Sequence, residues 1–152
     1  MRDEVTLHMA APPSAVWSLV TDVEAIGRYS PETFEGRWID GATGPAVGAR
    51  FQGHVKRNGR GPVYWTTCEV VTCEPGQEFA FAVITAGRPL NTWRYRLAPA
   101  GDGTDVTESF ELADTLPLRL YWRLLGWARG RTNREGMRTT LERIRAEVEA
   151  PV

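Results

Sequence analysis

Two cysteines and two histidines are all that this 152-residue sequence has of the residues that most often bind zinc or form disulfides. Cys68 and Cys73 lie five residues apart in a segment with the composition of a strand. In a regular strand this odd spacing places the two side chains on opposite faces, roughly 16 Å apart, which is too far for a disulfide. His8 and His54 complete no zinc-binding spacing. The sequence therefore predicts free thiols and no metal site.

An excess of charge and a long apolar run are also missing. Lys and Arg number 18 against 19 Asp and Glu, a formal net charge of −1, whereas nucleic-acid-binding proteins are usually strongly basic. No segment approaches the ~20 apolar residues of a membrane-spanning helix. Residues 1–10 carry Arg2, Asp3 and Glu4 before a short alternating run, unlike a signal peptide. We expect a cytoplasmic protein that does not bind nucleic acid.

Hydrophobic periodicity predicts an α+β domain over residues 1–152. A strand over 5–9 is followed by two short helices, one over 15–20 and one from 21 or 22 towards 29. Six further strands, separated by turns rich in Gly, Pro and Asn, are predicted at 35–40, 49–57, 63–74, 78–85, 92–98 and 105–112. Residues 116–149 have the period of one long helix. Hairpin-length turns predict a seven-stranded antiparallel sheet, curved around that helix.

Strand alternation assigns large side chains to the inner face of the sheet. In the sixth strand, for example, Trp93 and Tyr95 share one face and Arg94 lies on the other. The residues that we expect to surround a ligand are Trp38, Phe51, Tyr64, Cys68, Phe81, Val83, Trp93, Tyr95, Glu108 and Phe110 from the sheet, and Trp122, Leu125, Arg129, Asn133 and Met137 from the long helix.

Three glycines interrupt the middle of the long helix, at positions 126, 130 and 136. Each costs about 1 kcal/mol relative to alanine and removes a side chain where the sheet needs covering. We interpret them as leaving space for a ligand cavity with apolar walls. A break between two helices over residues 126–136 is the alternative.

Three segments resemble the START/SRPBCC superfamily, which has the helix-grip fold. They are Ala11-Pro12-Pro13-Ser14-Ala15-Val16-Trp17 with Val20-Thr21-Asp22-Val23-Glu24, then 44–51, and the closing Gly136-Met137-Arg138-Thr139-Thr140-Leu141-Glu142-Arg143-Ile144. The resemblance covers nearly the whole chain and favours the polyketide cyclase/dehydrase and lipid-transport branch. It implies a cavity between the sheet and the last helix, and no cofactor. Aromatase/cyclases of this fold use a cavity arginine, and Glu69 stands where that arginine would be expected.

Glu108 is the candidate residue for acid–base chemistry. Burial on an aromatic wall raises the pKa of a carboxyl group, and a nearby cation lowers it. Arg129, on the inward stripe of the helix, could be that cation. The pair could bind a carboxyl or enol, take part in catalysis, or form a structural ion pair that closes the cavity. Tyr64 and Tyr95 could donate hydrogen bonds to a ligand oxygen or simply pack.

Residues 116–127 are apolar almost all round, although a surface helix normally has a polar face. With Arg119 and Arg123, this segment suits contact with a membrane or a donor protein, a dimer contact, or packing under a loop. The function that we predict is carriage or sequestration of a small hydrophobic molecule, such as a lipid or a polyketide-like aromatic compound, by a monomer or homodimer. A polyketide cyclase/dehydratase and a protein-interaction module are the alternatives.

Overall fold

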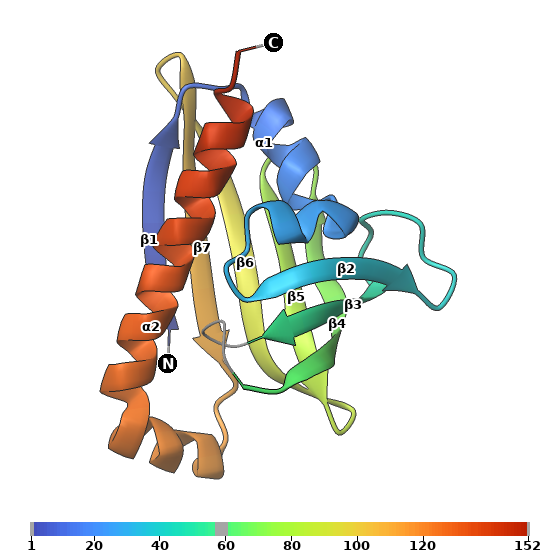
Figure 1. The fold of residues 1–152 in the computed structure, drawn as a ribbon, viewed down its shortest axis with the longest axis vertical. Coiled ribbons are helices and arrows are strands. Elements are labelled where there is room, and N and C mark those ends of the chain that lie inside the picture. Colours follow the sequence, from blue (N-terminus) through green and yellow to red (C-terminus); the bar gives the residue numbers. More distant parts are fainter. Residues whose placement is uncertain (1, 57–60, 152) are drawn as a thin grey trace.

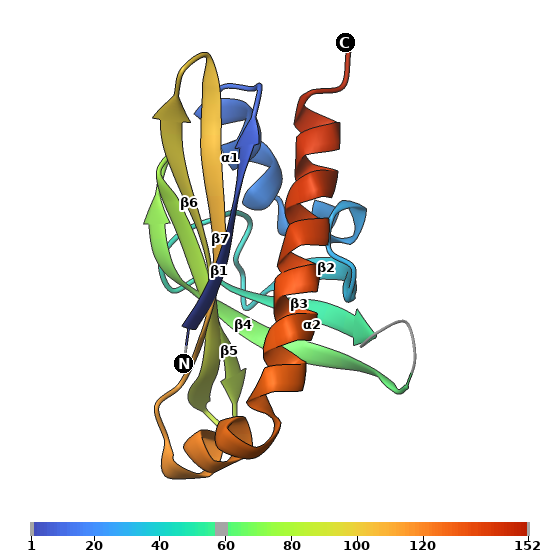
Figure 2. The same cartoon turned by 90° about the vertical axis from the view of Figure 1, so that its left-hand side faces the viewer.

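The computed structural model describes residues 2–56 and 61–151, so the predicted strand end at 57 lies outside the described residues. Seven antiparallel strands form one sheet in the order β1-β7-β6-β5-β4-β3-β2, which curves around a long helix (Figures 1 and 2). This is the predicted α+β helix-grip architecture. The elements are β1 (Arg2–Met9), α1 (Pro13–Val20), the 3-10 helix η1 (Val23–Arg28), β2 (Thr33–Ile39), β3 (Arg50–Lys56), β4 (Val63–Glu74), β5 (Glu78–Thr85), β6 (Arg88–Ala100), β7 (Gly103–Leu112) and α2 (Leu116–Val148).

The antiparallel register aligns inward-facing side chains in rows across the strands. Trp38 of β2 pairs with Phe51 of β3, which pairs with Cys68 of β4, which pairs with Val83 of β5. Directly opposed residues in a sheet point to the same side. One continuous row of the inner wall therefore crosses four strands.

A β-bulge at Val71 changes the side-chain alternation within β4. Cys68 pairs with Val83, whereas Cys73, beyond the bulge, pairs with Phe79. Phe79 and Val83 share a face of β5, because β5 is regular between them. The two cysteines therefore lie on the same face, and the predicted opposite faces are wrong because a bulge adds one residue to the period. Both thiols are free, as predicted.

The hairpin between β5 and β6 is tighter than the sequence predicted. Ala86 and Gly87 have φ values of 52° and 73°, which is the conformation of a two-residue turn that matches the twist of the strands. The strand that we expected to begin at Thr92 consequently begins at Arg88. This extension carries Asn91 to the inner wall, opposite Val83.

Helix α2 runs without interruption from Leu116 to Val148, so the alternative of two separate helices is wrong. Its first turns lie at an angle to the rest of the helix (Figure 1). Its carboxyl-terminal half closes the main core, where Leu141 and Ile144 are fully buried together with Val16 of α1 and Val106 of β7. The middle of the helix borders a cavity instead.

The amino-terminal end of α2 is exposed rather than packed under a loop. Leu116, Leu124 and Trp127 are 78%, 64% and 79% exposed, and Leu120, Tyr121 and Leu125 are also exposed. Leu125 was expected to face the ligand cavity, and this prediction is wrong because its side chain is exposed to solvent and does not line the cavity. Among the residues that the structure describes, no helix has both the length and the apolarity needed to cross a bilayer.

Candidate ligand cavity

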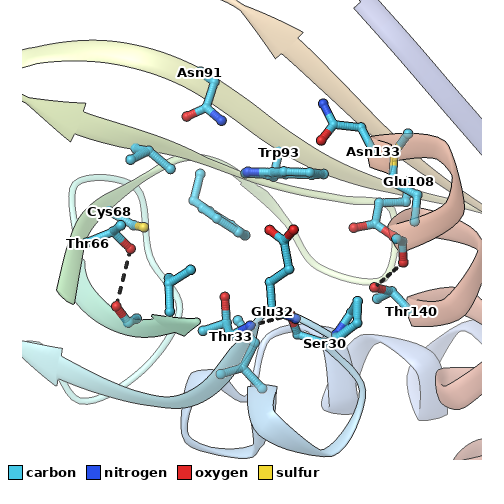
Figure 3. Close-up of a pocket in the computed structure, with 18 of the residues that line it drawn as sticks. Ser30, Glu32, Thr33, Thr66, Cys68, Asn91, Trp93, Glu108, Asn133 and Thr140 are labelled. Atoms are coloured by element: carbon cyan, nitrogen blue, oxygen red, sulfur yellow. Dashed lines mark hydrogen bonds between the residues drawn. The ribbon is translucent and has the colours of Figure 1, made fainter. Parts of the chain in front are cut away.

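A cavity of about 240 Å³ lies between the inner face of the sheet, the loop from η1 to β2, and the middle of α2 (Figure 3). Its walls combine aromatic and aliphatic side chains with a comparable number of polar and charged ones, including Glu32, Asn91, Glu108, Arg129 and Asn133. The predicted residues that line it are Phe51, Tyr64, Cys68, Phe81, Val83, Trp93, Tyr95, Glu108, Arg129, Asn133 and Met137. Strand alternation and helix periodicity thus correctly predicted most of the residues that line this cavity.

Three other predicted residues do not line the cavity but belong to aromatic clusters that reach its wall. Trp38 packs edge-on against Phe51, with ring centroids 5.7 Å apart. Phe110 lies beside Trp93 across the β6–β7 ladder at 4.9 Å, and Trp122 stacks on Phe110 at 6.3 Å. The expected position of these three side chains in the cavity wall is therefore wrong.

Two of the three helix glycines make room for Trp122 rather than for the cavity. A Cβ atom at Gly126 would lie 2.6 Å from Cδ1 of Trp122, and one at Gly130 would lie 3.6 Å from Cζ2. The indole therefore lies along the helix surface over both glycines. Gly136 borders the cavity itself, and a Cβ there would approach only Cγ of Pro31, at 4.0 Å. Of the three glycines, only Gly136 leaves space beside the cavity, whereas our interpretation assigned this role to all three.

Glu108 is buried on the inner wall, with 4% of its surface exposed. The Tyr95 hydroxyl donates a hydrogen bond to its Oε1 atom at 3.1 Å, while Oε2 has no partner. Burial raises the pKa of Glu108 to about 8, against the opposing effect of the Tyr95 hydrogen bond. The carboxyl group is therefore mostly protonated at neutral pH.

Further polar groups gather around Glu108. Tyr29, which follows η1, is 3% exposed, and burial together with the neighbouring Glu108 carboxyl raises the pKa of its phenol. The same causes raise the pKa of Tyr95 well above its ordinary value. Asn133 of α2 is 4% exposed, and its Nδ2 atom has no partner. Tyr29 escaped the sequence analysis because it lies just outside a short helix, where no periodicity gives its direction.

Arg129 does not form the expected ion pair with Glu108. Its Nη1 atom lies 3.8 Å from Oε1 of Glu32, and both side chains are about a quarter exposed (20% and 27%). Glu32 reaches towards the cavity from the loop before β2 (Figure 3). The pair thus joins α2 to this loop, and both of its side chains line the cavity.

The loop that carries Glu32 is held by Ser30. The backbone N–H groups of Thr33 and Glu32 donate to the Ser30 hydroxyl at 3.0 and 3.4 Å. Ser30, Pro31, Glu32 and Thr33 all line the cavity. Nothing in the sequence indicated that these four residues line a cavity, since the only signal in this segment, Ser-Pro, marks the end of a helix.

Cys68 and Glu69, which are neighbours in β4, point to opposite faces of the sheet. Cys68 is 3% exposed, and burial raises the pKa of its thiol to about 12. Glu69, the next residue, points to the other face of the sheet, where Arg50 donates to its Oε2 atom at 3.0 Å. No group of three or more His, Cys, Asp or Glu side chains gathers to hold a metal within residues 2–56 and 61–151.

Comparison with models of known protein families identifies the family of the chain. The model of the family described as "Polyketide cyclase / dehydrase and lipid transport" matches residues 2–149. The chain belongs to this family. This match confirms the resemblance to the polyketide cyclase/dehydrase and lipid-transport branch. No curated protein sequence matches the chain.

Solved structures of other proteins share the fold. The protein NE0264 of Nitrosomonas europaea is 16% identical, with a TM-score of 0.70 over 95% of this chain and 92% of its own. The Polyketide_cyc-like protein Cgl2372 of Corynebacterium glutamicum is 28% identical, with a TM-score of 0.58 over 97% and 93%. The di-domain ARO/CYC StfQ of the steffimycin biosynthetic pathway is 16% identical, with a TM-score of 0.72 over 97% of this chain and 50% of its own.

Proposed function

We propose that this protein is a cytoplasmic binding protein that carries or sequesters a compact, largely apolar molecule. The supporting observation is the cavity of about 240 Å³ walled by Phe51, Phe81 and Trp93. Protein interiors are normally packed with few voids larger than a water molecule, so a space of this size with aromatic walls favours a guest. Ligand sites commonly measure ~300–1,000 Å³. The smaller volume here favours a polyketide-like aromatic compound over a long-chain lipid.

Binding of the fluorescent probe 1-aminoanthracene tests this function. We expect its fluorescence to rise on binding and a ligand of similar size to displace it. Val83→Phe, which places a larger side chain in the cavity wall, should abolish the fluorescence increase. Val71→Phe is the matched control, because Val71 is 43% exposed and is not part of the wall. Equal binding by both variants would refute a ligand site in this cavity.

Catalysis as a polyketide cyclase/dehydratase is the second candidate function. It is favoured by Glu108, whose pKa of about 8 lies close to the working pH, where general acid–base catalysis is most effective. Tyr95 holds this carboxyl in place, whereas Arg129, engaged with Glu32, is less suited to assist. Turnover of a poly-β-ketone that collapses in Glu108→Gln, while affinity for the substrate survives, would assign an enzyme. Parallel loss of turnover and affinity would assign binding alone.

The exposed end of α2, residues 116–127, is our candidate surface for ligand exchange at an anionic membrane. Leu124 and Trp127 are largely exposed, and indole rings favour the boundary between water and lipid. Arg123 is exposed and forms no ion pair with the described residues, while Arg119 is paired with Asp114. An apolar surface with basic residues binds anionic lipids. A donor protein or a second copy of the chain are the other occupants that a binding experiment distinguishes.

A further inference from the structure

Three residues that line the cavity each have a buried polar atom without a hydrogen-bond partner. These atoms are Oδ1 of Asn91 on β6, Oε2 of Glu108 on β7 and Nδ2 of Asn133 on α2. Glu108 and Asn133 lie on the α2 side of the cavity, and Asn91 lies apart from them (Figure 3). Buried polar groups nearly always have a partner in folded proteins. The unpartnered atoms of Glu108 and Asn133, from two different elements, therefore point to a group that is supplied by a ligand.

The hydrogen bond from Tyr95 fixes the chemical character of the first atom. Because the Tyr95 hydroxyl donates to Oε1, Oε1 is the acceptor, and the proton of the neutral carboxyl is carried by Oε2. Asn133 Nδ2 is an amide donor. The unpartnered atoms of Glu108 and Asn133 are thus both hydrogen-bond donors, which an acceptor atom of a ligand would satisfy.

The groups nearest Glu108 are neutral, and the charged side chains of the cavity are already paired. Tyr95 of β6 and Tyr29 after η1 are buried phenols with raised pKa values. Arg129 of α2, which also lines the cavity, is paired with Glu32, and Val5 of β1 is opposite Glu108 in the sheet. A ligand carboxylate would have to compete with Glu32 for Arg129 to offset its loss of hydration. A neutral acceptor suits the site better.

We propose that Glu108 and Asn133 form a polar subsite that hydrogen-bonds the carbonyl oxygen of an otherwise apolar ligand. This inference rests on the proposed binding function and specifies the class of ligand. The ketone oxygen would accept from Oε2–H of Glu108 and from Nδ2–H of Asn133. The apolar remainder would lie against Phe51, Phe81 and Trp93.

A matched pair of rigid compounds, 9-fluorenone and fluorene, tests the subsite. They differ in a ketone oxygen and have nearly the same shape. Calorimetry or displacement of 1-aminoanthracene should show that the protein prefers fluorenone over fluorene by about tenfold, the equivalent of about 1.4 kcal/mol. Glu108→Leu and Asn133→Leu should each reduce the ratio of the fluorenone affinity to the fluorene affinity.

Two further measurements keep the test decisive if the leucine variants fail to fold. Glu108→Gln keeps the size of the side chain and an N–H donor, so it should retain the preference for fluorenone. In the unmodified protein the preference should decline as the pH rises through about 8, where Glu108 ionises and Oε2 stops donating. In Glu108→Gln the preference should not change with pH.

The outcomes separate this inference from the proposed function. Equal affinity for fluorenone and fluorene at every pH would overturn the polar subsite and leave cavity binding in place. A preference that persists unchanged above pH 9 would also overturn the role of Glu108. Failure to bind either compound, or 1-aminoanthracene, would overturn the proposed function itself.

Discussion

The Tyr95 hydroxyl donates to Glu108 Oε1 across the β6–β7 ladder, at 3.1 Å. Within the described residues this phenol is the carboxyl group's hydrogen-bond partner, and no cation pairs with it. Burial therefore outweighs the hydrogen bond and raises the pKa of Glu108 from 4.5 to about 8. Folding of the domain is therefore coupled to the binding of one proton by Glu108.

We predict that this proton makes stability depend on pH. Between pH 4.5 and about 8 the folded protein holds a proton that the unfolded chain releases. The contribution of Glu108 to the free energy of unfolding should therefore be highest below pH 4.5. It should fall as the pH rises to 8, by up to about 1.4 kcal/mol per pH unit. Urea denaturation between pH 5 and 9 measures this slope. Glu108→Gln should flatten it, and parallel curves for the two proteins would contradict the prediction.

Two glycines of α2 should respond in opposite ways to alanine. Gly130→Ala places a Cβ 3.6 Å from the Trp122 ring, an ordinary contact, so better helix propensity should raise the free energy of unfolding by up to about 1 kcal/mol. Gly126→Ala places a Cβ 2.6 Å from Cδ1 of Trp122, so the indole must leave Phe110. We expect a loss of about 1–3 kcal/mol, as in other overpacked sites. Chemical denaturation of both variants, side by side, provides the comparison. A gain of equal size in both would show that Trp122 is not held over Gly126.

The ion pair between Arg129 and Glu32 should control ligand exchange more than stability. Both side chains are partly exposed and lie 3.8 Å apart, so the pair contributes under about 1 kcal/mol to folding. Because it joins α2 to the loop before β2, its loss should ease access to the cavity. Stopped-flow fluorescence with 1-aminoanthracene should show faster association and faster dissociation in Glu32→Gln, with an equilibrium constant close to that of the unmodified protein. Unchanged rates would exclude this pair as a barrier to exchange.

Vesicle binding should depend on the exposed apolar residues of the 116–127 segment. Replacing Leu124 and Trp127 with serine removes two largely exposed side chains, each of which gains free energy on burial. Cosedimentation with phosphatidylglycerol vesicles should drop by about tenfold or more in the double variant. Binding of 1-aminoanthracene should remain, because neither residue lines the cavity. If vesicles do not bind but the variant abolishes a dimer in ultracentrifugation, the surface is a homodimer contact instead.

Strand periodicity was sufficient to predict the inner wall, because side chains alternate strictly wherever the sheet is regular. Phe51, Phe81, Trp93 and Tyr95 all border the cavity as that rule requires. The rule gives the face of a side chain but not how far the cavity extends along that face, which is why Phe110, beside Trp93 in the sheet, does not line it. Regular alternation also failed at the bulge in β4, which no residue of that segment signals.

The other side of the cavity could not be predicted from periodicity. Ser30 and Glu32 lie in a loop, and their place in the wall depends on tertiary packing between η1, β2 and α2. Helix period gave Arg129 the right direction but not its partner, since its long side chain reaches a loop far away in sequence. The rotamer of Trp122, which fills the space over Gly126, is likewise a product of packing against Phe110.

The buried thiol of Cys68 has a consequence for what the cavity can safely contain. At a pKa of about 12, roughly one molecule in 10⁵ carries the thiolate at pH 7, and the thiolate is the nucleophilic form of cysteine. An enone or another electrophilic carbonyl compound could therefore lie against this sulfur without being alkylated. This part of the wall would not react with molecules that readily alkylate ordinary, exposed thiols.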